Sequence, residues 1–244
     1  MSPAAEIRLQ EERPGRLLVV AAHPGDADSA VAGSVSRWIV AGSVVHLVCC
    51  TSGDASADDA AADPLEVAAA REAEQRAAAA IVGYEDVSFM HRPEGALAND
   101  LALREQLVRL IRMFRPDVVA APDPRLIVDE RGFVQHVDHR AAGAAAVDAV
   151  SPAAHTAMTF PHLVKSEGLR PHRVGRLLLY WPERVNAIVD ISDTVETKLS
   201  ALRAHASRHS QADDLDGRVR GRARDEGAPV GIEAGESYAV IDLR

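Results

Sequence analysis

Residues 16–28 read "RLLVVAAHPGDAD", an apolar run followed at once by a histidine, a proline, a glycine and two aspartates. The apolar run is typical of a parallel strand that is covered on both faces. Side chains that bind metals then stand where the strand ends, and in open α/β sheets ligands bind at the carboxyl ends of the strands. This stretch therefore predicts both the fold class and the place of a functional site.

The segments that follow continue an alternation of strands and helices. We expect helices at 28–41, 64–83 and 101–114, and strands at 43–51, 87–90 and 117–121. Pro64 and Gly83 stand at the start and end of the second helix, where these residues are favoured. The alternation predicts an α/β fold of the Rossmann-like kind, with a mostly parallel sheet and helices on both faces.

Beyond residue 150 the alternation weakens. We expect strands at 177–181 and 186–191, a helix at 194–207, a charged and mobile segment at 211–236, and a final edge strand at 237–243. No linker or repeat divides the chain. The expected organisation is one domain over 1–244, with a Rossmann-like core at 1–150 and a smaller α+β portion at 151–244 that completes the pocket.

Composition excludes several classes of function. The net charge of the 244 residues is −9 and no lysine- or arginine-rich block occurs, so a nucleic-acid partner is not expected. No signal peptide is visible and no apolar run approaches the roughly 20 residues that span a bilayer. We expect a cytoplasmic protein without a membrane partner, and the sequence allows a homo-oligomer. Cys49 and Cys50, neighbours within an expected strand, fit buried core better than a reactive pair.

Two stretches carry the chemistry. They are His23-Pro24-Gly25-Asp26 after the first strand and His136-Val137-Asp138-His139 before an alanine-rich helical segment. Histidine and carboxylate are ordinary ligands of catalytic zinc, which keeps three protein ligands and one open position. Each stretch alone could have a purely structural role: His23 as a histidine whose hydrogen bonds are made within the protein, and Asp138 as a helix cap. Together, in this order, they favour a shared metal site.

The same stretches resemble a family, the LmbE/PIG-L-type metal-dependent N-deacetylases. "AHPGDAD" is similar to the family's AHPDDxE motif, and "QHVDHRAAG" is similar to its His-x-Asp-His motif. "AAAREAEQRAAAAIVG", "PEGAL" and "KLSALRAHAS" resemble three further family segments, so the likeness runs from about residue 16 to residue 240. The resemblance implies removal of an acyl group, in the first place acetyl, from a small N-acyl amino sugar or a related amide.

By position, the resemblance implies a role for several residues. Zn²⁺ or another divalent metal would be held by His23, Asp26 and His139. His136 would act on the tetrahedral intermediate or the leaving amine, and Asp138 would orient it. Two further residues, Arg71 and Glu94, match substrate-contacting positions; Glu94 is one methylene longer than the family's aspartate, which bears on the sugar preference.

One position departs from the family pattern. Members carry an aspartate as general base where this chain has Gly25, which has no proton acceptor. General-base help contributes about 10²- to 10⁴-fold, so efficient hydrolysis would need another base. Asp28, His136 and Asp54 are the candidates. The competing interpretations are a pseudoenzyme that binds metal and a sugar-like ligand without turnover, and a substitution introduced to trap substrate.

For the remaining histidines and aromatic residues we favour a structural role over a functional one. His205 and His209 stand four apart on an expected helix, like a zinc-binding pair, although the family motifs already fill a metal site. The proline-interrupted stretch with His155, His162 and His172 is expected at the surface, or else over the pocket mouth. Tyr180 and Trp181 fit a sugar pocket or the core. A dinucleotide site is excluded because the first turn lacks G-x-G-x-x-G.

Overall fold

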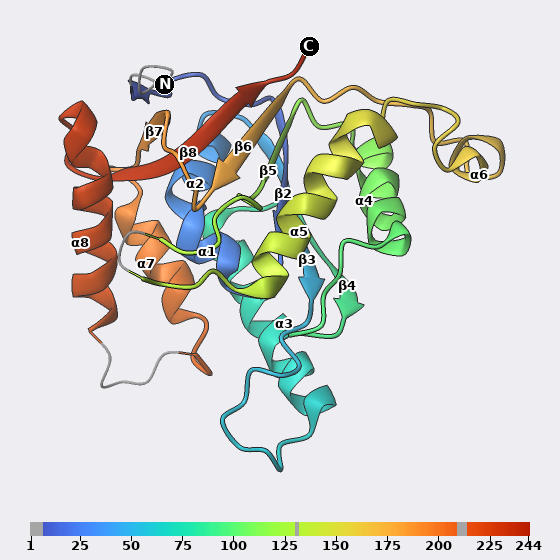
Figure 1. Ribbon diagram of the computed structural model, residues 1–244. Coiled ribbons are helices and arrows are strands. Elements are labelled where there is room, and N and C mark those ends of the chain that lie inside the picture. Colours follow the sequence, from blue (N-terminus) through green and yellow to red (C-terminus); the bar gives the residue numbers. More distant parts are fainter. Residues whose placement is uncertain (1–6, 130–131, 209–213) are drawn as a thin grey trace.

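The computed structural model describes residues 7–129, 132–208 and 214–244. Its centre is an eight-stranded sheet in the order β1-β7-β8-β6-β5-β2-β3-β4 (Figure 1). The strands are β1 (Arg8–Leu9), β2 (Arg16–Ala21), β3 (Val44–Thr51), β4 (Asp86–Arg92), β5 (Val118–Pro122), β6 (Arg176–Tyr180), β7 (Ala187–Asp190) and β8 (Gly235–Asp242). All neighbouring strands pair in parallel except β8, which is antiparallel to β6 and β7. The predicted α/β class is confirmed.

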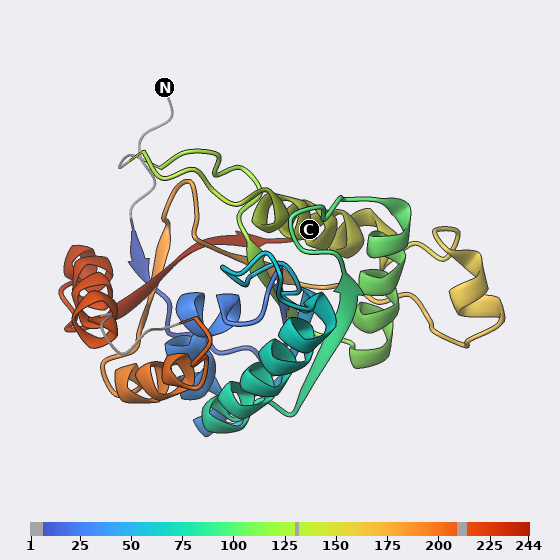
Figure 2. The same ribbon diagram turned by 90° about the horizontal axis from the view of Figure 1, so that it is seen from below.

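Helices cover both faces of this sheet, as Figure 2 shows when the sheet is seen from below. One face carries α1 (Asp26–Ala30), α2 (Ala32–Val40), α3 (Pro64–Val82), α7 (Val195–Arg203) and α8 (Leu215–Gly227). The other face carries α4 (Leu101–Phe114), α5 (Val137–Asp148) and α6 (Pro161–Lys165). A π-helical turn (Ala149–Ala153) and a 3₁₀ turn (Ala228–Val230) complete the helical segments of the described chain.

The alternation of side chains along β2 separates two hydrophobic cores. Leu17, Val19 and Ala21 belong to the core beneath α1, α2, α3 and α7, whereas Leu18 and Val20 belong to the core beneath α4 and α5. Successive side chains of a strand point to opposite faces, so a strand buried on both sides must be apolar throughout. This explains the uninterrupted run that precedes His23.

Local signals at the helix ends agree with the structure. The Asp63 side chain accepts the amide of Leu65 at 2.9 Å at the start of α3, and Gly83 ends that helix with φ 101°. The Asp100 side chain caps α4 by accepting the amide of Leu103 at 2.7 Å. These caps satisfy amides that have no partner within the helix.

Three expectations for individual elements are wrong. The helix expected at 28–41 is two helices, because Val31 between them has a non-helical φ of −134°. Much of 211–236 is helical, as α8, although its first residues, 211–213, lie outside the described chain. The final strand lies inside the sheet, between β7 and β6, rather than at its edge.

The inserted strand β8 is also tied to the helices behind it. Glu236 is 1% exposed, and its carboxylate accepts the amides of Gly33 at 3.0 Å and Ser34 at 2.8 Å at the start of α2. Lys198 of α7 donates to the same carboxylate at 2.6 Å. A buried carboxylate is stable when its charge and lone pairs are matched in this way. Glu236 thereby joins β8 to α2 and α7.

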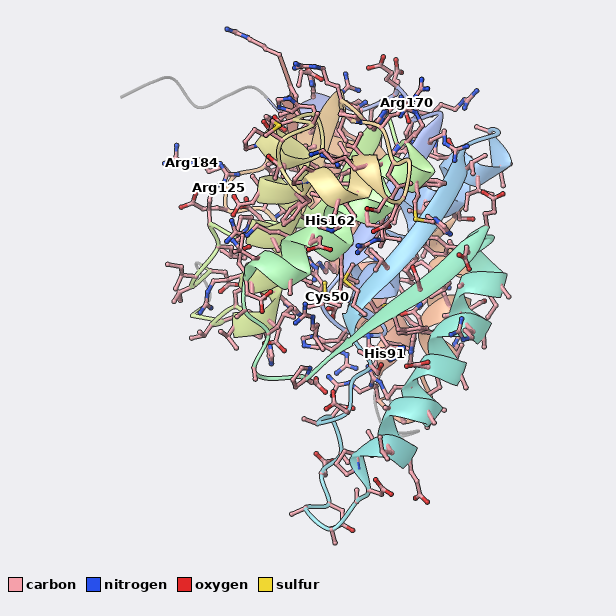
Figure 3. The ribbon with its side chains drawn as sticks, turned by 90° about the vertical axis from the view of Figure 1, so that its right-hand side faces the viewer. Cys50, His91, Arg125, His162, Arg170 and Arg184 are labelled. Atoms are coloured by element: carbon pink, nitrogen blue, oxygen red, sulfur yellow. The ribbon has the colours of Figure 1, made fainter. Side chains whose placement is uncertain are left out.

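Figure 3 shows the side of the molecule formed by α4, α6 and β4, with Cys50 inside it. Both cysteines are free and fully buried, in agreement with the core reading. His162 pairs with Glu105 at 3.0 Å, and the nearby His172 with the carbonyl of Pro116 at 2.7 Å. This stretch therefore packs beside α4 as surface structure. Within the described ranges, no helix is long and apolar enough to cross a membrane.

Candidate metal centre

The site begins at the carboxyl end of β2, where the order of strands changes direction. From β2 the chain proceeds outward to β3 and β4, whereas β5 and β6 lie on its other side. Such a switch point leaves a crevice between the loops that leave two neighbouring strands. The loops after β2 and β5 lead into α1 and α5 respectively, and these loops carry the two histidine-containing stretches.

The turn after β2 is held by backbone contacts. Gly25 has φ 92°, a left-handed conformation that favours glycine, and its amide donates to Gln75 Oε1 at 2.7 Å. Asp26 Oδ2 accepts the amide of His23 at 2.8 Å. This contact folds Asp26 back over the end of the strand, so its carboxylate and the His23 ring face the same space.

The structure brings His23, Asp26 and His139 together. One nitrogen or carboxylate oxygen from each lies within 4.8 Å of the others, which suits a shared ion. His23 Nδ1 is 3.2 Å and His139 Nε2 is 3.3 Å from Asp26 Oδ2. His139 reaches this place because α5 begins two residues earlier, directly beyond the edge of the sheet.

The far nitrogen of each histidine has its own acceptor. His23 Nε2 lies 3.0 Å from Asp138 Oδ2, and His139 Nδ1 lies 2.9 Å from Gln135 Oε1. Histidines that bind metals almost always donate their other ring nitrogen in this way, which sets the tautomer and the ring orientation. The near nitrogens are thereby left as lone pairs for a cation, so the three side chains fit a divalent metal.

A second triplet, His23, His136 and Asp138, also has donor atoms within 4.8 Å. Its carboxylate is already engaged, because Asp138 accepts the amides of Gly95 at 2.6 Å and Leu97 at 3.1 Å besides the His23 contact. Asp138 is fully buried and its role in these contacts is to position other groups. The first triplet is therefore the better metal site.

The pKa values of His23 and Asp26 depend strongly on the charges around them. Burial lowers the pKa of His23, but its hydrogen bonds with Asp138 and Asp26 and the negative charges of Asp26 and Glu94 raise it, to about 10 overall. Burial raises the pKa of Asp26, and the charges and hydrogen bonds of His139 and His23 outweigh this and lower it well below its usual range. Without a metal, a proton on His23 compensates the carboxylates.

His136 lies beside the cluster but is not oriented as the sequence suggested. Its ring meets that of His23 edge-on with centroids 4.8 Å apart, and its side chain is partly exposed. The carboxylate of Asp138 is 4.0 Å from His136 Nδ1, too far for a hydrogen bond, because it is engaged with His23. The backbone amide of Asp138 donates to His136 Nδ1 instead, at 3.1 Å. Burial and the charge of His23 lower the pKa of His136.

Asp28 does not join the cluster. It is fully buried, and its Oδ2 accepts from Gln75 Nε2 and lies 2.8 Å from His205 Nε2. The ring of His205 packs 3.7 Å from the position that a Cβ on Gly25 would occupy. Asp28 thus orients His205 on the far side of Gly25. His209, the other member of the expected pair, lies outside the described residues.

The two expected substrate-contacting residues flank the cluster. Glu94 Oε1 lies 3.8 Å from His23 Nε2, while Glu94 Oε2 accepts the amide of Ala55 at 3.0 Å. Arg71 is 3% exposed and donates from Nη2 to the carbonyl of Pro24. Its Nε and Nη1 have no hydrogen-bond partner in the described part of the chain.

Sequence reasoning missed one residue that shapes the site, Gln135, and left the roles of Tyr180 and Trp181 open. Gln135, which holds His139, stands directly before the second motif and has no distinguishing pattern. Trp181 was weighed with Tyr180, and the structure separates them: Tyr180 is buried with its hydroxyl on the Val20 carbonyl, whereas the ring centroid of Trp181 lies 4.8 Å from that of His139. Only the fold could distinguish the two aromatic residues.

A cavity of about 340 Å³ opens beside Asp26 and Gly25. It extends between α7 and α8, which lie side by side in Figure 1. Its walls include Trp181 and His205 near the cluster, and a row of arginines from α8 farther out. This volume accommodates a small molecule next to Asp26, one of the three candidate ligands.

Comparison with known proteins gives a consistent picture. Residues 18–150 match the PIG-L family, described as GlcNAc-PI de-N-acetylase. The chain is 30% identical to a diacetylchitobiose deacetylase of Thermococcus kodakarensis over 196 residues, 79% of this chain and 70% of the relative. It is 28% identical to a 1D-myo-inositol 2-acetamido-2-deoxy-alpha-D-glucopyranoside deacetylase of Mycobacterium sp. (strain KMS), covering 84% of this chain and 77% of the relative.

Among solved structures, the fold is similar to that of an N,N'-diacetylchitobiose deacetylase from Pyrococcus horikoshii in complex with an inhibitor. The TM-score is 0.86 at 27% identity, over 94% of this chain and 84% of the other. The likeness thus extends beyond the segment that matches the family, into the strands and helices after residue 150.

Proposed function

The chain belongs to the PIG-L family of de-N-acetylases, and on that premise we propose that it is a metal-dependent amidohydrolase. Its substrate would be an N-acyl amino sugar or a related small amide, and the acyl group removed would in the first place be acetyl. The relatives named above as deacetylases of N-acetylated sugars support this substrate class.

The observation that carries the proposal is that both ring nitrogens of His23 and of His139 face a polar side chain. Each has one nitrogen near Asp26 and the other on a side-chain acceptor, Asp138 or Gln135. We propose that His23, Asp26 and His139 hold Zn²⁺ or another divalent ion. When bound, such an ion polarises the acyl carbonyl and makes water a nucleophile near neutral pH.

His136 would supply hydrogen bonding to the reacting group. Because its Nδ1 accepts the Asp138 amide, the neutral ring carries its proton on Nε2. The lowered pKa of His136 favours this neutral form near pH 7. Nε2 would donate a hydrogen bond to the acyl oxygen as negative charge develops there, and the leaving amine would take its proton from the group or solvent that received the proton of the attacking water.

The proton of the attacking water has no acceptor at position 25. Asp28 is committed to His205 and Gln75, and His136 is a donor in the tautomer described above. Asp54, which is half-buried and holds the amide of Glu94 with Oδ1, is the remaining candidate from the sequence. We propose that hydrolysis proceeds slowly, with this proton passing to Asp54 or to solvent.

The alternative is a protein that binds the metal and a sugar-like ligand without turnover, and Gly25 is the observation that favours it. The two functions give different results when zinc-loaded protein is incubated with diacetylchitobiose and with N-acetylglucosamine. Acetate release in proportion to bound zinc supports the hydrolase. Zinc binding and ligand binding with no acetate release support the binding protein.

A metal-free protein that remains inert and takes up no zinc would contradict both functions. The matched control is His162→Ala, which removes a histidine of α6 that is paired with Glu105 of α4, away from the cluster. Zinc content and acetate release should be unchanged in this variant. A cytoplasmic location, a homo-oligomeric state and the role of 151–244 in completing the pocket stay predictions; Trp181 and His205 in the cavity wall support the last.

A further inference from the structure

The cavity beside Asp26 has a continuous apolar component in its wall. The apolar side chains that line it are Trp181, Ala30 of α1, Leu202 of α7, and Leu215, Val219 and Ala223 of α8. Residues 215, 219 and 223 stand four apart, so they share one face of α8. Leu215 and Val219 are only half-buried, because the packing of α8 against α7 does not cover this face completely. The uncovered part faces the cavity.

The charged side chains of the same wall leave this apolar surface free. Lys198 pairs with Glu236, and Arg222 pairs with Glu226, each at 2.6 Å. The arginines of the wall are all exposed: Arg208, Arg218 and Arg222. Long cationic side chains cover apolar surface with their methylene stems while their charged ends stay in water. The cavity is therefore suited to an apolar group rather than to a second charge.

Trp181 borders both the metal cluster and the cavity. Its ring centroid lies 4.8 Å from that of His139, and the residue also belongs to the cavity wall. The backbone of Trp181 has a φ of 48°, a left-handed conformation that is unfavourable for a bulky side chain. Such strain persists where the surrounding structure enforces it, and it is frequent at binding sites. Trp181 is thus placed to shape the entrance from the cluster into the cavity.

The residue expected to contact the sugar lies on the other side of the cluster. Glu94 follows β4, and the loop after β3 holds it, through Asp54 Oδ1 and the amide of Ala55, each at 3.0 Å. The cavity instead adjoins the half of the sheet formed by β6, β8 and β7, and Figure 1 shows α7 and α8 on one side of α1 and β3 and β4 on the other. Neither Glu94 nor Arg71 lines the cavity. An amide whose sugar lies toward Glu94 leaves the cavity for its acyl group.

We propose that the cavity between α7 and α8 binds the acyl chain of the substrate, so that this protein prefers unbranched N-acyl groups longer than the acetyl group named for its relatives. Trp181 and Val219 would determine this specificity. The inference rests on the proposed hydrolase function for the identity of the substrate, but binding of the chain does not require turnover. Each methylene that is fully buried contributes about fourfold to affinity, and acetyl has none to bury.

The test is equilibrium binding by calorimetry to zinc-loaded protein, with glucosamine that carries an N-acetyl, N-butanoyl or N-hexanoyl group. We expect the affinity to rise about two- to fourfold for each added methylene, and at least about tenfold from acetyl to hexanoyl. A fourth probe, the hexyl glycoside of N-acetylglucosamine, carries a similar chain on the amine portion. It should bind within about threefold of N-acetylglucosamine, because its chain does not point into the cavity.

The variant is Val219→Trp, which fills the cavity, and the matched control is Val40→Trp. Val40 is 85% exposed at the end of α2 and does not line the cavity. Val219→Trp should reduce the preference for hexanoyl over acetyl to within about twofold and leave the affinity for N-acetylglucosamine unchanged. Val40→Trp should change neither. If Val219→Trp does not fold, Val219→Thr, of nearly the same shape but more polar, should weaken the hexanoyl probe more than the acetyl probe.

Four results would overturn the inference. They are equal affinity for the three N-acyl probes, no binding of any probe, tighter binding of the hexyl glycoside than of the N-hexanoyl probe, and equal weakening of acetyl and hexanoyl probes by the Val219 variants. The third result would assign the cavity to the amine portion of the ligand.

Release of the carboxylic acid, measured separately, reports on the proposed function. If no probe is hydrolysed but affinity rises with chain length and depends on Val219, the acyl-chain cavity stands and the hydrolase assignment falls. If acetate is released while affinity is independent of chain length, the hydrolase stands and the acyl-chain cavity falls.

Discussion

Two buried aspartate–histidine pairs lie on either side of Gly25. In one, His23 Nε2 is 3.0 Å from Asp138, and in the other His205 Nε2 is 2.8 Å from Asp28. Both aspartates are fully buried. The two pairs use the same ring nitrogen and the same acceptor chemistry.

They differ in what the other ring nitrogen meets. His23 Nδ1 faces Asp26, and His139 faces the same carboxylate. His205 Nδ1 is buried and has no partner among the residues described, and its ring packs against Gly25. A buried aspartate that orients a histidine is therefore insufficient for a site. What distinguishes the two pairs is a carboxylate at the other ring nitrogen, which His23 has in Asp26 and His205 lacks. The following variants disrupt the first arrangement or add a carboxylate beside the second.

The largest effect is expected when a candidate metal ligand is lost. His139→Ala should abolish stoichiometric zinc binding and lower acetate release by about 10³-fold or more, because the metal contributes several kcal/mol to the barrier. Metal content by mass spectrometry and initial rates measure this. Retention of one zinc per chain in His139→Ala would rule out the proposed ligand set.

Gly25→Asp supplies the second pair with a carboxylate neighbour and restores an acceptor for the water proton. The atoms nearest to a Cβ at this position belong to the His205 ring at 3.7 Å, an ordinary contact, and aspartate tolerates the left-handed φ of 92° better than most residues. If the natural chain lacks only its base, the rate should rise about 10²-fold or more. Gly25→Asn, of nearly the same shape, should show no gain. A fall in rate in both variants would favour a mechanism rebuilt around glycine.

Removing the charge of each aspartate compares the pairs directly. Asp138→Asn should weaken zinc binding about 10- to 100-fold, the usual effect of losing an outer partner of a metal-binding histidine. Asp28→Asn should leave zinc affinity unchanged and lower the free energy of unfolding by about 1–3 kcal/mol, because buried hydrogen bonds are lost. Zinc titration and urea denaturation of both variants give the two quantities. Equal effects on zinc affinity would make the two pairs equivalent.

The last effect concerns pH, and its size per pH unit is at the low end of the changes expected above. The pKa of His23 in the metal-free protein is about 10, so below that pH a metal must displace its proton. Zinc affinity should therefore rise with pH, by about tenfold per unit for each proton released, over the range 6 to 8. Calorimetry in buffers of different ionisation enthalpy counts the protons. An affinity that is independent of pH would show that His23 is not a ligand.

Much of the fold follows from local patterns in the sequence. The apolar run at 16–22 and the capped helix at 64–83 correspond to β2 and α3, because strand alternation and helix caps are short-range properties. Helix α8 was missed because it has few apolar residues. It is stabilised by the Asp214 cap and by ion pairs that include Arg220 with Glu196 and Arg203 with Asp216.

The candidate site, like the fold, could be predicted only where it depends on short-range patterns. Residue types and their places after a strand and before a helix favoured a shared metal site for the two stretches, and the family resemblance implied His23, Asp26 and His139 as its ligands, which the structure brings together. The partner of Asp138 was predicted as its neighbour His136, but it is His23, which is 115 positions away. Contacts of that kind depend on how the loops after β2 and β5 pack, which no spacing within a motif reveals.

The insertion of β8 between β6 and β7 has a consequence for how the chain acquires its structure during synthesis. Translation delivers the N-terminal residues first, but β8, which joins β1 and β7 to the other five strands of the sheet, is made after both parts. Until residues 235–242 leave the ribosome, β7 lacks its antiparallel neighbour β8 and Lys198 lacks its ion-pair partner Glu236. The growing chain must therefore carry exposed strand edges, and nascent β6 and β7 are the segments that a chaperone would be expected to shield.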